Sequence, residues 1–167
     1  IAGGADELSA ADSAIFDIMG AASVLNETPE LTPKPWDKNR DGLVIGEGAG
    51  TLILEDLEHA VKRGARIYAE VSGFGTNMDG THITTPNAPT QSIALRLALE
   101  DAEITPDKIS YINAHGTSTI LNDKIEEIEE YKNIAFFHHL FLENVYCILS
   151  FAFIVLVVNF DCNPNGV

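Results

Sequence analysis

The sequence has little cysteine, and this excludes two classes of small protein. Only Cys147 and Cys162 occur among the 167 residues. Two thiols cannot build a disulfide framework or a zinc site with four thiolate ligands. So low a cysteine content fits a reducing compartment, so we predict a cytoplasmic protein.

Positive charge is also scarce. The chain has 10 Lys and Arg residues against 25 Asp and Glu residues, which gives a formal net charge of -15 at pH 7. A surface this acidic repels phosphate backbones and anionic lipid headgroups. We therefore predict that the protein has no nucleic-acid partner.

Metal-ligand spacings are lacking as well. The five histidines have no H-E-x-x-H or C-x-x-C companion, and these are spacings that zinc sites use. Residues 37–42 resemble the first half of a calcium loop, but Gly48 stands where that loop needs a bidentate glutamate. The sequence therefore predicts no metal site.

A glycine-rich run at residues 46–50 invites comparison with dinucleotide-binding loops. The third glycine of the G-x-G-x-x-G pattern would fall on Thr51, and the run leads into a strand-like segment rather than a helix. We therefore interpret the glycines as a place where two backbones pack closely.

The remaining composition is that of a folded domain, but it changes along the chain. Hydrophobic residues make up 46% and charged residues 21% of the sequence, which is ordinary for a globular protein. Residues 131–167, however, contain only Lys132, Glu143 and Asp161 as charged residues. The start at Ile1, inside a strand-like run with a glycine turn at Gly3 and Gly4, predicts a fragment that begins within a fold.

Strand-like and helix-like runs alternate, and this predicts a layered α/β fold in which helices cover a sheet. Ser9 or Asp12 is expected to cap the first helix, and Thr90 or Ser92 the third. Expected strands are 43–45, 50–54, 67–74 and 109–114, expected helices lie within 8–25, 55–63 and 90–102, and 28–35 is expected to be a proline-rich loop.

His115 stands at the end of the last of these strands. A glycine and three hydroxyl residues follow it, Thr117, Ser118 and Thr119. An imidazole at a strand end can present one fixed nitrogen to a cleft, and hydroxyls beyond a flexible glycine can bind an amide-bearing ligand. Taken alone, such a histidine is more often structural than catalytic.

Seven segments together resemble the β-ketoacyl-acyl carrier protein synthases, the condensing enzymes of the thiolase-like superfamily. The resemblance covers residues 1–126 and implies a partial thiolase-like layered αβαβα fold. The segments are AGGADELS (2–9), FDIMGAAS (16–23), PWDKNRDGLVIGEGAG (35–50), LEDLEHAVKRGARIYAEVSGFG (54–75), HITTP (82–86), NAHGTST (113–119) and LNDKIE (121–126).

The resemblance implies a chemistry for His115. In this family a cysteine thiolate accepts an acyl chain, a malonyl thioester loses carbon dioxide, and the resulting enolate attacks the acyl-enzyme. His115 would donate an N–H to the developing enolate oxygen, which needs a neutral imidazole in a dry pocket. No free cofactor is implied, because acyl carrier protein carries the substrates on phosphopantetheine.

The resemblance also implies supporting residues. Thr117 and Thr119 would bind the amides of the phosphopantetheine arm, and Thr84 and Thr85 would line the same tunnel. Phe16 matches a residue that lines the acyl pocket, although it is equally explained as core. Asp123 and Glu126 share one helix face and would organise the region behind the histidines, or they are ordinary acids of a first helical turn.

The resemblance ends near Glu127. The nucleophilic cysteine and second histidine of the family have no counterpart in residues 1–126, and Ile120 stands where the family usually has proline, which implies a looser turn. We predict that this chain alone is inactive, that the full-length family member is a homodimer, and that residues 127–167 are a non-homologous tail from frameshifted or unspliced translation.

Two other interpretations stay open from the sequence. One is a non-catalytic partner of the chain-length-factor type, which resembles these synthases but lacks the cysteine. The other is a membrane-tethered protein that uses the apolar run 145–160, which is short for a bilayer span.

Overall fold

A computed structural model of the chain describes residues 1–126, 146–151 and 154–159. The chain divides into two compact units. The first contains residues 1–55, 82–85 and 116–124, and the second contains residues 56–81 and 86–115 with the described residues of 125–167.

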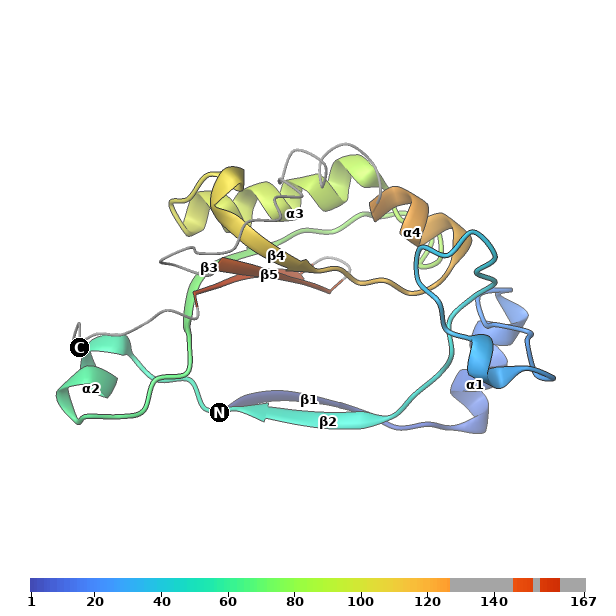
Figure 1. Cartoon of the computed structure of the whole chain (residues 1–167), viewed down its shortest axis with the longest axis horizontal. Coiled ribbons are helices and arrows are strands. Elements are labelled where there is room, and N and C mark those ends of the chain that lie inside the picture. Colours follow the sequence, from blue (N-terminus) through green and yellow to red (C-terminus); the bar gives the residue numbers. More distant parts are fainter. Residues whose placement is uncertain (127–145, 152–153, 160–167) are drawn as a thin grey trace. The chain divides into compact units, whose positions relative to one another are not determined.

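An antiparallel ribbon of β1 (Ala2–Asp6) and β2 (Gly48–Leu52) belongs to the first unit (Figure 1). The expected glycine turn is wrong, because Gly3 and Gly4 continue the strand and pair with β2. The predicted close packing of glycines does occur, since a Cβ atom on Gly3 would collide with the carbonyl oxygen of Gly50. Every residue of the ribbon is exposed.

Two short helices follow β1 in this unit. The helix α1 (Ala10–Ile18) begins after Ser9, whose hydroxyl accepts a hydrogen bond from the backbone N–H of Asp12 at 3.1 Å. Ser9 is thus one of the two caps predicted from the sequence, and the other candidate, Asp12, lies inside the helix. The 3₁₀ helix η1 (Pro29–Leu31) lies within the proline-rich segment that was expected to be a loop.

The strand expected at residues 43–45 does not form. Leu43 makes only an isolated bridge with Ala22. Gly42 comes so close to the backbone of this neighbouring segment that a Cβ atom would lie 2.6 Å from the carbonyl oxygen of Ala21. Backbone contact with an irregular segment, rather than a strand ladder, therefore fixes this part of the chain.

Asp41 anchors the same part of the chain. Its Oδ2 atom accepts hydrogen bonds from the hydroxyl of Ser23 at 2.8 Å and the backbone N–H of Val24 at 2.9 Å. Burial raises the pKa of the Asp41 carboxyl, but these hydrogen bonds and the charge of Lys34 together lower it by more, so the pKa lies below 3.8.

Asp41→Asn is expected to lower the free energy of unfolding by about 1 kcal/mol at pH 7, because the amide accepts these hydrogen bonds less strongly than a carboxylate. A depressed folded-state pKa contributes stability above pH 3.8 that is lost as pH falls through the folded-state value. The difference in free energy of unfolding between wild type and variant should therefore shrink below pH 3.8. Urea titrations at pH 7 and at pH 3 measure this difference. The exposed carboxylate of Glu30 gives the control Glu30→Gln, and a difference that is independent of pH would contradict the prediction.

The second unit contains a four-stranded sheet in the order β3-β6-β5-β4. The pairs β3–β6 and β5–β6 are antiparallel, and β4–β5 is parallel. The helix α4 (Ile120–Glu126) follows β4 in sequence, but its residues 120–124 belong to the first unit. The elements of the second unit are α2 (Leu57–Lys62), β3 (Glu70–Thr76), α3 (Ala88–Asp101), the 3₁₀ helix η2 (Pro106–Lys108), β4 (Ile109–Asn113), β5 (Tyr146–Phe151) and β6 (Ile154–Asn159).

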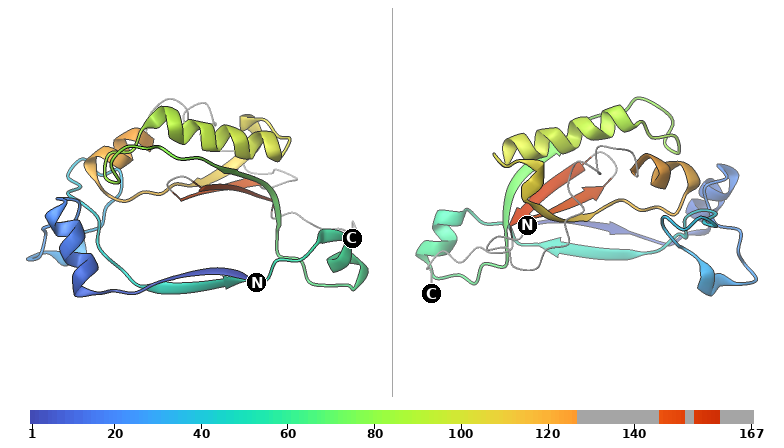
Figure 2. Two further views of the ribbon diagram at one scale, coloured as in Figure 1. Left: turned by 180° about the vertical axis from the view of Figure 1, so that it is seen from behind. Right: turned by 45° about the horizontal axis from the view of Figure 1, so that its top comes forward.

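The helix α3 covers one face of this sheet (Figure 2). Two glycines of β3 permit the contact, because a Cβ atom on Gly73 or Gly75 would collide with the carbonyl oxygen of Ala98 or Ala94, respectively. The core of the unit lies between helix and sheet and consists of Ala94, Leu95, Ala98, Leu99, Ile109 and Val157. The sheet is thus held by helix backbone packed directly on strand backbone.

The expected elements of this unit form with shifted ends. The helix α2 begins after Asp56, whose carboxylate accepts the backbone N–H of His59 at 3.0 Å, and the strands β3 and β4 match their predictions. The helix α3 begins after Asn87, so the expected cap at Thr90 or Ser92 is wrong. Pro89 lies in its first turn, where a missing N–H costs nothing.

The described parts of the apolar run 145–160 form the strands β5 and β6. Within the ranges that the structure describes, no helix is both long and apolar enough to cross a bilayer. Residues 127–145, the first part of the predicted tail, lie outside the described residues.

Candidate active site

Residues 114–119, which contain the glycine and the three hydroxyl residues after His115, form the turn between β4 and α4. Gly116 has a φ of +55°, and a Cβ atom there would lie 2.9 Å from the Trp36 ring. The expected flexible glycine is therefore a packed one, because both its conformation and its neighbour exclude a side chain.

Thr117 and Thr119 lie together in this turn. Their hydroxyl oxygens are 2.9 Å apart, and the Thr119 hydroxyl accepts the backbone N–H of Asn122 at 3.3 Å. Both threonines are only partly buried. The two hydroxyls therefore form one polar pair, on two residues that are partly exposed.

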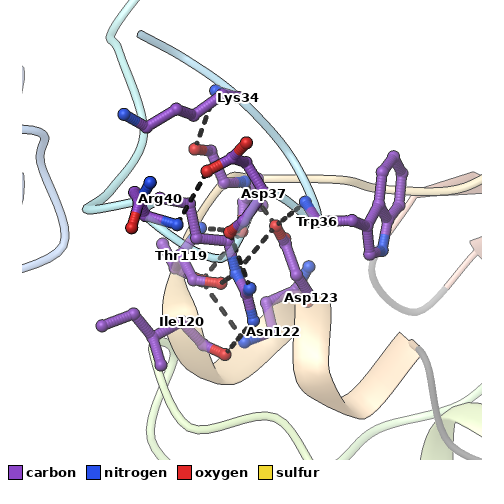
Figure 3. A network of polar contacts seen from close by, with 11 residues as sticks. Lys34, Trp36, Asp37, Arg40, Thr119, Ile120, Asn122 and Asp123 are labelled. Carbon is purple, nitrogen blue, oxygen red and sulfur yellow. Dashed lines mark hydrogen bonds and ion pairs between the residues drawn. The ribbon is translucent and has the colours of Figure 1, made fainter.

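Asp123 lies beneath the turn as a fully buried carboxylate. Its Oδ1 atom accepts the backbone N–H of Ser118 at 3.1 Å, and its Oδ2 atom accepts that of Trp36 at 2.9 Å (Figure 3). The Nε atom of Arg40 lies 3.2 Å from Oδ2. A single carboxylate thus joins the turn to the loop at residues 34–40.

Arg40 makes further contacts with the same turn. Its Nε atom donates to the carbonyl oxygen of Thr119 at 3.2 Å and its Nη2 atom to that of Ile120 at 2.9 Å (Figure 3). The hydroxyl of Ser118 accepts the backbone N–H of Lys34 at 3.0 Å. The looser turn expected from Ile120 is not found, because its carbonyl group is anchored.

His115 and Glu126 form a separate contact in the second unit. The backbone N–H of His115 donates to Oε1 of Glu126 at 2.9 Å, and Glu126 is buried. The two carboxylates expected on one face of α4 therefore serve different segments. The structure leaves His115 exposed, so the described residues do not supply the dry pocket that the sequence led us to expect.

Thr84 and Thr85 form a local turn with His82. The Thr84 hydroxyl lies 3.0 Å from Nδ1 of His82, and the Thr85 backbone N–H donates to the His82 carbonyl oxygen at 2.8 Å. These contacts stay within residues 82–85, so they do not join this turn to the threonine pair. Phe16 is half-buried on α1.

Sequence reasoning missed Arg40, Trp36 and Lys34 as partners of the turn. All three lie in the segment PWDKNRDG or directly beside it, where the acids suggested half of a calcium loop. The available signal was Arg40 itself, which lies between Asp37 and Asp41. An arginine that becomes buried requires a carboxylate or carbonyl partner, so Arg40 could have been predicted to bind another segment. Among the residues that the structure describes, no group of three His, Cys, Asp or Glu could hold a metal ion.

Comparison with known proteins identifies the two parts of the chain. Residues 1–60 match the beta-ketoacyl synthase N-terminal domain, and residues 68–140 match the beta-ketoacyl synthase C-terminal domain. A curated relative, 3-oxoacyl-[acyl-carrier-protein] synthase 2 of Vibrio cholerae, is 46% identical over 129 residues, which are 75% of this chain and 31% of the relative. The chain therefore spans about a third of the length of that relative.

Solved structures agree with the sequence matches. A beta-ketoacyl synthase from Burkholderia phymatum superposes with a TM-score of 0.80 at 34% identity, covering 95% of this chain and 53% of that one. A type II PKS ketosynthase in complex with its acyl-carrier protein gives 0.68 at 37% identity, covering 78% and 32%. These likenesses confirm the expected thiolase-like fold, present here as a partial mixed α/β structure. Matches to both domains of one synthase, in their natural order, show that the chain belongs to the β-ketoacyl synthase family.

Proposed function

We propose that the chain is part of a β-ketoacyl-acyl carrier protein synthase that elongates fatty acids by decarboxylative condensation of malonyl-acyl carrier protein with an acyl thioester. The observation that carries this proposal is the turn after β4, where the hydroxyls of Thr117 and Thr119 lie 2.9 Å apart on residues that are partly exposed. The family match and the relatives' names support the reaction class.

The proposed roles follow from what each group can donate or accept. The threonine hydroxyls can donate to the carbonyl oxygens, and accept from the N–H groups, of the two amides in a phosphopantetheine arm. His115 precedes the same turn, and an N–H of its imidazole would stabilise the enolate oxygen that forms when malonate loses carbon dioxide. Because the described residues leave His115 exposed, this role requires other parts of the parent enzyme to cover the ring. Glu126 holds the backbone of His115 through a 2.9 Å hydrogen bond and so fixes the point from which the ring extends.

Other parts of the proposal concern residues elsewhere in the sequence. We assign Thr84 and Thr85 to the lining of the substrate tunnel and Phe16 to the acyl pocket. Neither Cys147 nor Cys162 is a candidate nucleophile, because neither lies in the small-residue context of the family's catalytic cysteine. We therefore propose that these 167 residues bind the substrate arm but do not condense.

The partner in this proposal is acyl carrier protein. The related type II PKS ketosynthase forms a complex with its own acyl-carrier protein, which supports a carrier of the same class here. A net charge of -15 opposes docking of an acidic carrier, so the basic docking residues belong to other parts of the enzyme. We further propose a cytoplasmic location and a homodimeric parent enzyme.

Titration with S-acetyl-pantetheine, followed by NMR of the threonine methyl groups, tests the proposed binding. Thr117→Val and Thr119→Val are each expected to raise the dissociation constant at least tenfold, a loss of about 1.4 kcal/mol, because valine keeps the shape and removes the hydroxyl. Thr51→Val, at an exposed position of β2, is the matched control. Equal affinities for all three variants and wild type would refute the assignment of the threonine pair.

A carbon–carbon bond-forming assay with malonyl- and acyl-acyl carrier protein tests the proposed inactivity. No product is expected from the purified 167-residue chain. Condensation at a measurable rate would show that a nucleophile is present after all.

A further inference from the structure

Arg40 has more partners in its unit than a surface arginine needs. Its guanidinium group donates to the carbonyl oxygens of Thr119, Ile120 and Asp37 and forms an ion pair with Asp123. Only 11% of its side chain is exposed, and the Asp123 side chain is fully buried. An arginine buried to this extent fixes the groups around it, because each of them would otherwise lose a partner in a site with little water.

Two residues beside this ion pair have a strained backbone. Trp36 and Ser118 both lie in the left-handed region, with φ values of +60° and +66°. Such conformations persist in non-glycine residues only when their surroundings hold them. Each of the two donates its backbone N–H to a different oxygen of the Asp123 carboxylate.

The carboxylate therefore holds both strained residues, and Arg40 holds the carboxylate. Ser118 lies between Thr117 and Thr119, so its conformation sets the direction in which the two neighbouring hydroxyls project. The hydroxyl of Ser118 also accepts the backbone N–H of Lys34 at 3.0 Å, which ties the same residue to the loop that carries Arg40.

We infer that Arg40 is a positioning residue, which locks the left-handed turn at Ser118 and thereby aims the Thr117 and Thr119 hydroxyls at the amides of a pantetheine thioester. The locking stands on the contacts above, and the identity of the ligand rests on the proposed function. Arg40 itself touches no substrate in this assignment.

The planar shape of the guanidinium group is essential to this role. Nε and Nη2 reach the carboxylate and two carbonyl oxygens of one helix start together, whereas a lysine ammonium offers a single point of charge. Arg40→Lys therefore separates charge compensation from positioning, and Arg40→Gln removes both.

Amide hydrogen exchange tests the positioning without any ligand. In Arg40→Lys and Arg40→Gln, the backbone amides of Lys34, Trp36 and Ser118 are expected to exchange at least tenfold faster than in wild type, while those of β3 and α3 keep their rates. Arg96→Gln is the matched control, because Arg96 forms an exposed ion pair with Glu100 at 3.8 Å. If these amides exchange in Arg40→Lys at the wild-type rate, the inference is overturned, since a positive charge alone would then be sufficient to hold the turn.

Binding of S-acetyl-pantetheine separates this inference from the proposed function. Arg40→Lys is expected to raise the dissociation constant at least fivefold without urea, where Trp36 fluorescence shows that the variant is still folded. If Thr117→Val weakens binding and Arg40→Lys does not, the inference fails and the proposed function stands. If wild type shows no binding, the proposed function fails, and the exchange rates still decide whether Arg40 holds the turn. If Arg40→Gln does not fold, the exchange rates of Arg40→Lys alone decide.

Discussion

Replacing Asp123 by alanine is expected to lower the free energy of unfolding by about 3–5 kcal/mol, the usual cost of removing one partner from a buried ion pair. The change leaves the Arg40 guanidinium, only 11% exposed, without its carboxylate. It also removes the acceptor from the backbone N–H groups of Trp36 and Ser118. Urea unfolding followed by the fluorescence of Trp36, the only tryptophan of the sequence, measures the loss at the site itself.

Two further variants keep this prediction falsifiable. Asp123→Asn retains the shape and one acceptor oxygen, so we expect a smaller loss of about 2 kcal/mol and a protein that can still be studied if the alanine variant does not fold. Glu100→Ala removes an exposed carboxylate from a surface ion pair and should cost less than about 1 kcal/mol. An Asp123→Ala protein as stable as Glu100→Ala would show that the buried network contributes little.

Adding one methyl group at Gly75 is expected to destabilise the second unit by about 3 kcal/mol, at the upper end of what overpacking usually costs. The new Cβ atom would collide with the carbonyl oxygen of Ala94 and lie 2.6 Å from the backbone nitrogen of Ala98. Both atoms belong to the backbone of α3, so no side-chain rotation relieves the contact. The helix has to move away from β3, which opens the core that it covers.

Circular dichroism during urea unfolding measures this effect, and Trp36 fluorescence reports the first unit in the same sample. Gly48→Ala is the matched control, because Gly48 also lies in a strand and a Cβ atom there would meet nothing within 4 Å. We expect the control to stay within about 0.5 kcal/mol of wild type, the ordinary range for an unconstrained surface change. Equal stability of Gly75→Ala and Gly48→Ala would contradict the packing of α3 on β3.

The sequence predicted the elements whose signals are local. The helix α1 was expected with its cap at Ser9 or Asp12, and the structure has it at Ser9, while β4 and α3 were expected from hydrophobic pattern and strand composition. Those signals depend on neighbours along the chain, so they survive when much of a fold is absent. The strand expected at residues 43–45 failed for the converse reason, because an apolar run becomes a strand only when another strand pairs with it.

The site was predicted only in part. Thr117 and Thr119 were expected to act together, and the structure places their hydroxyls side by side. Their roles remain predictions. Arg40 was missed because its partners in the turn lie 79 and 80 positions later in the sequence, so an arginine among acids could suggest a buried partner but not identify it. The exposure of His115 also depends on which parts of the fold surround it, which the motif alone does not specify.

The ribbon of β1 and β2 has a consequence for how these two segments find each other. Gly4 faces Gly50 across it, and all of its residues are exposed, so neither face carries a side-chain set that would favour one alignment over a slipped one. The backbone N–H of Leu8 donates to the carboxylate of Glu47 at 3.4 Å, just beyond the paired residues. The contact between Leu8 and Glu47, which lies outside the ladder, therefore helps to set the register of the two strands, because the strands' own side chains do not.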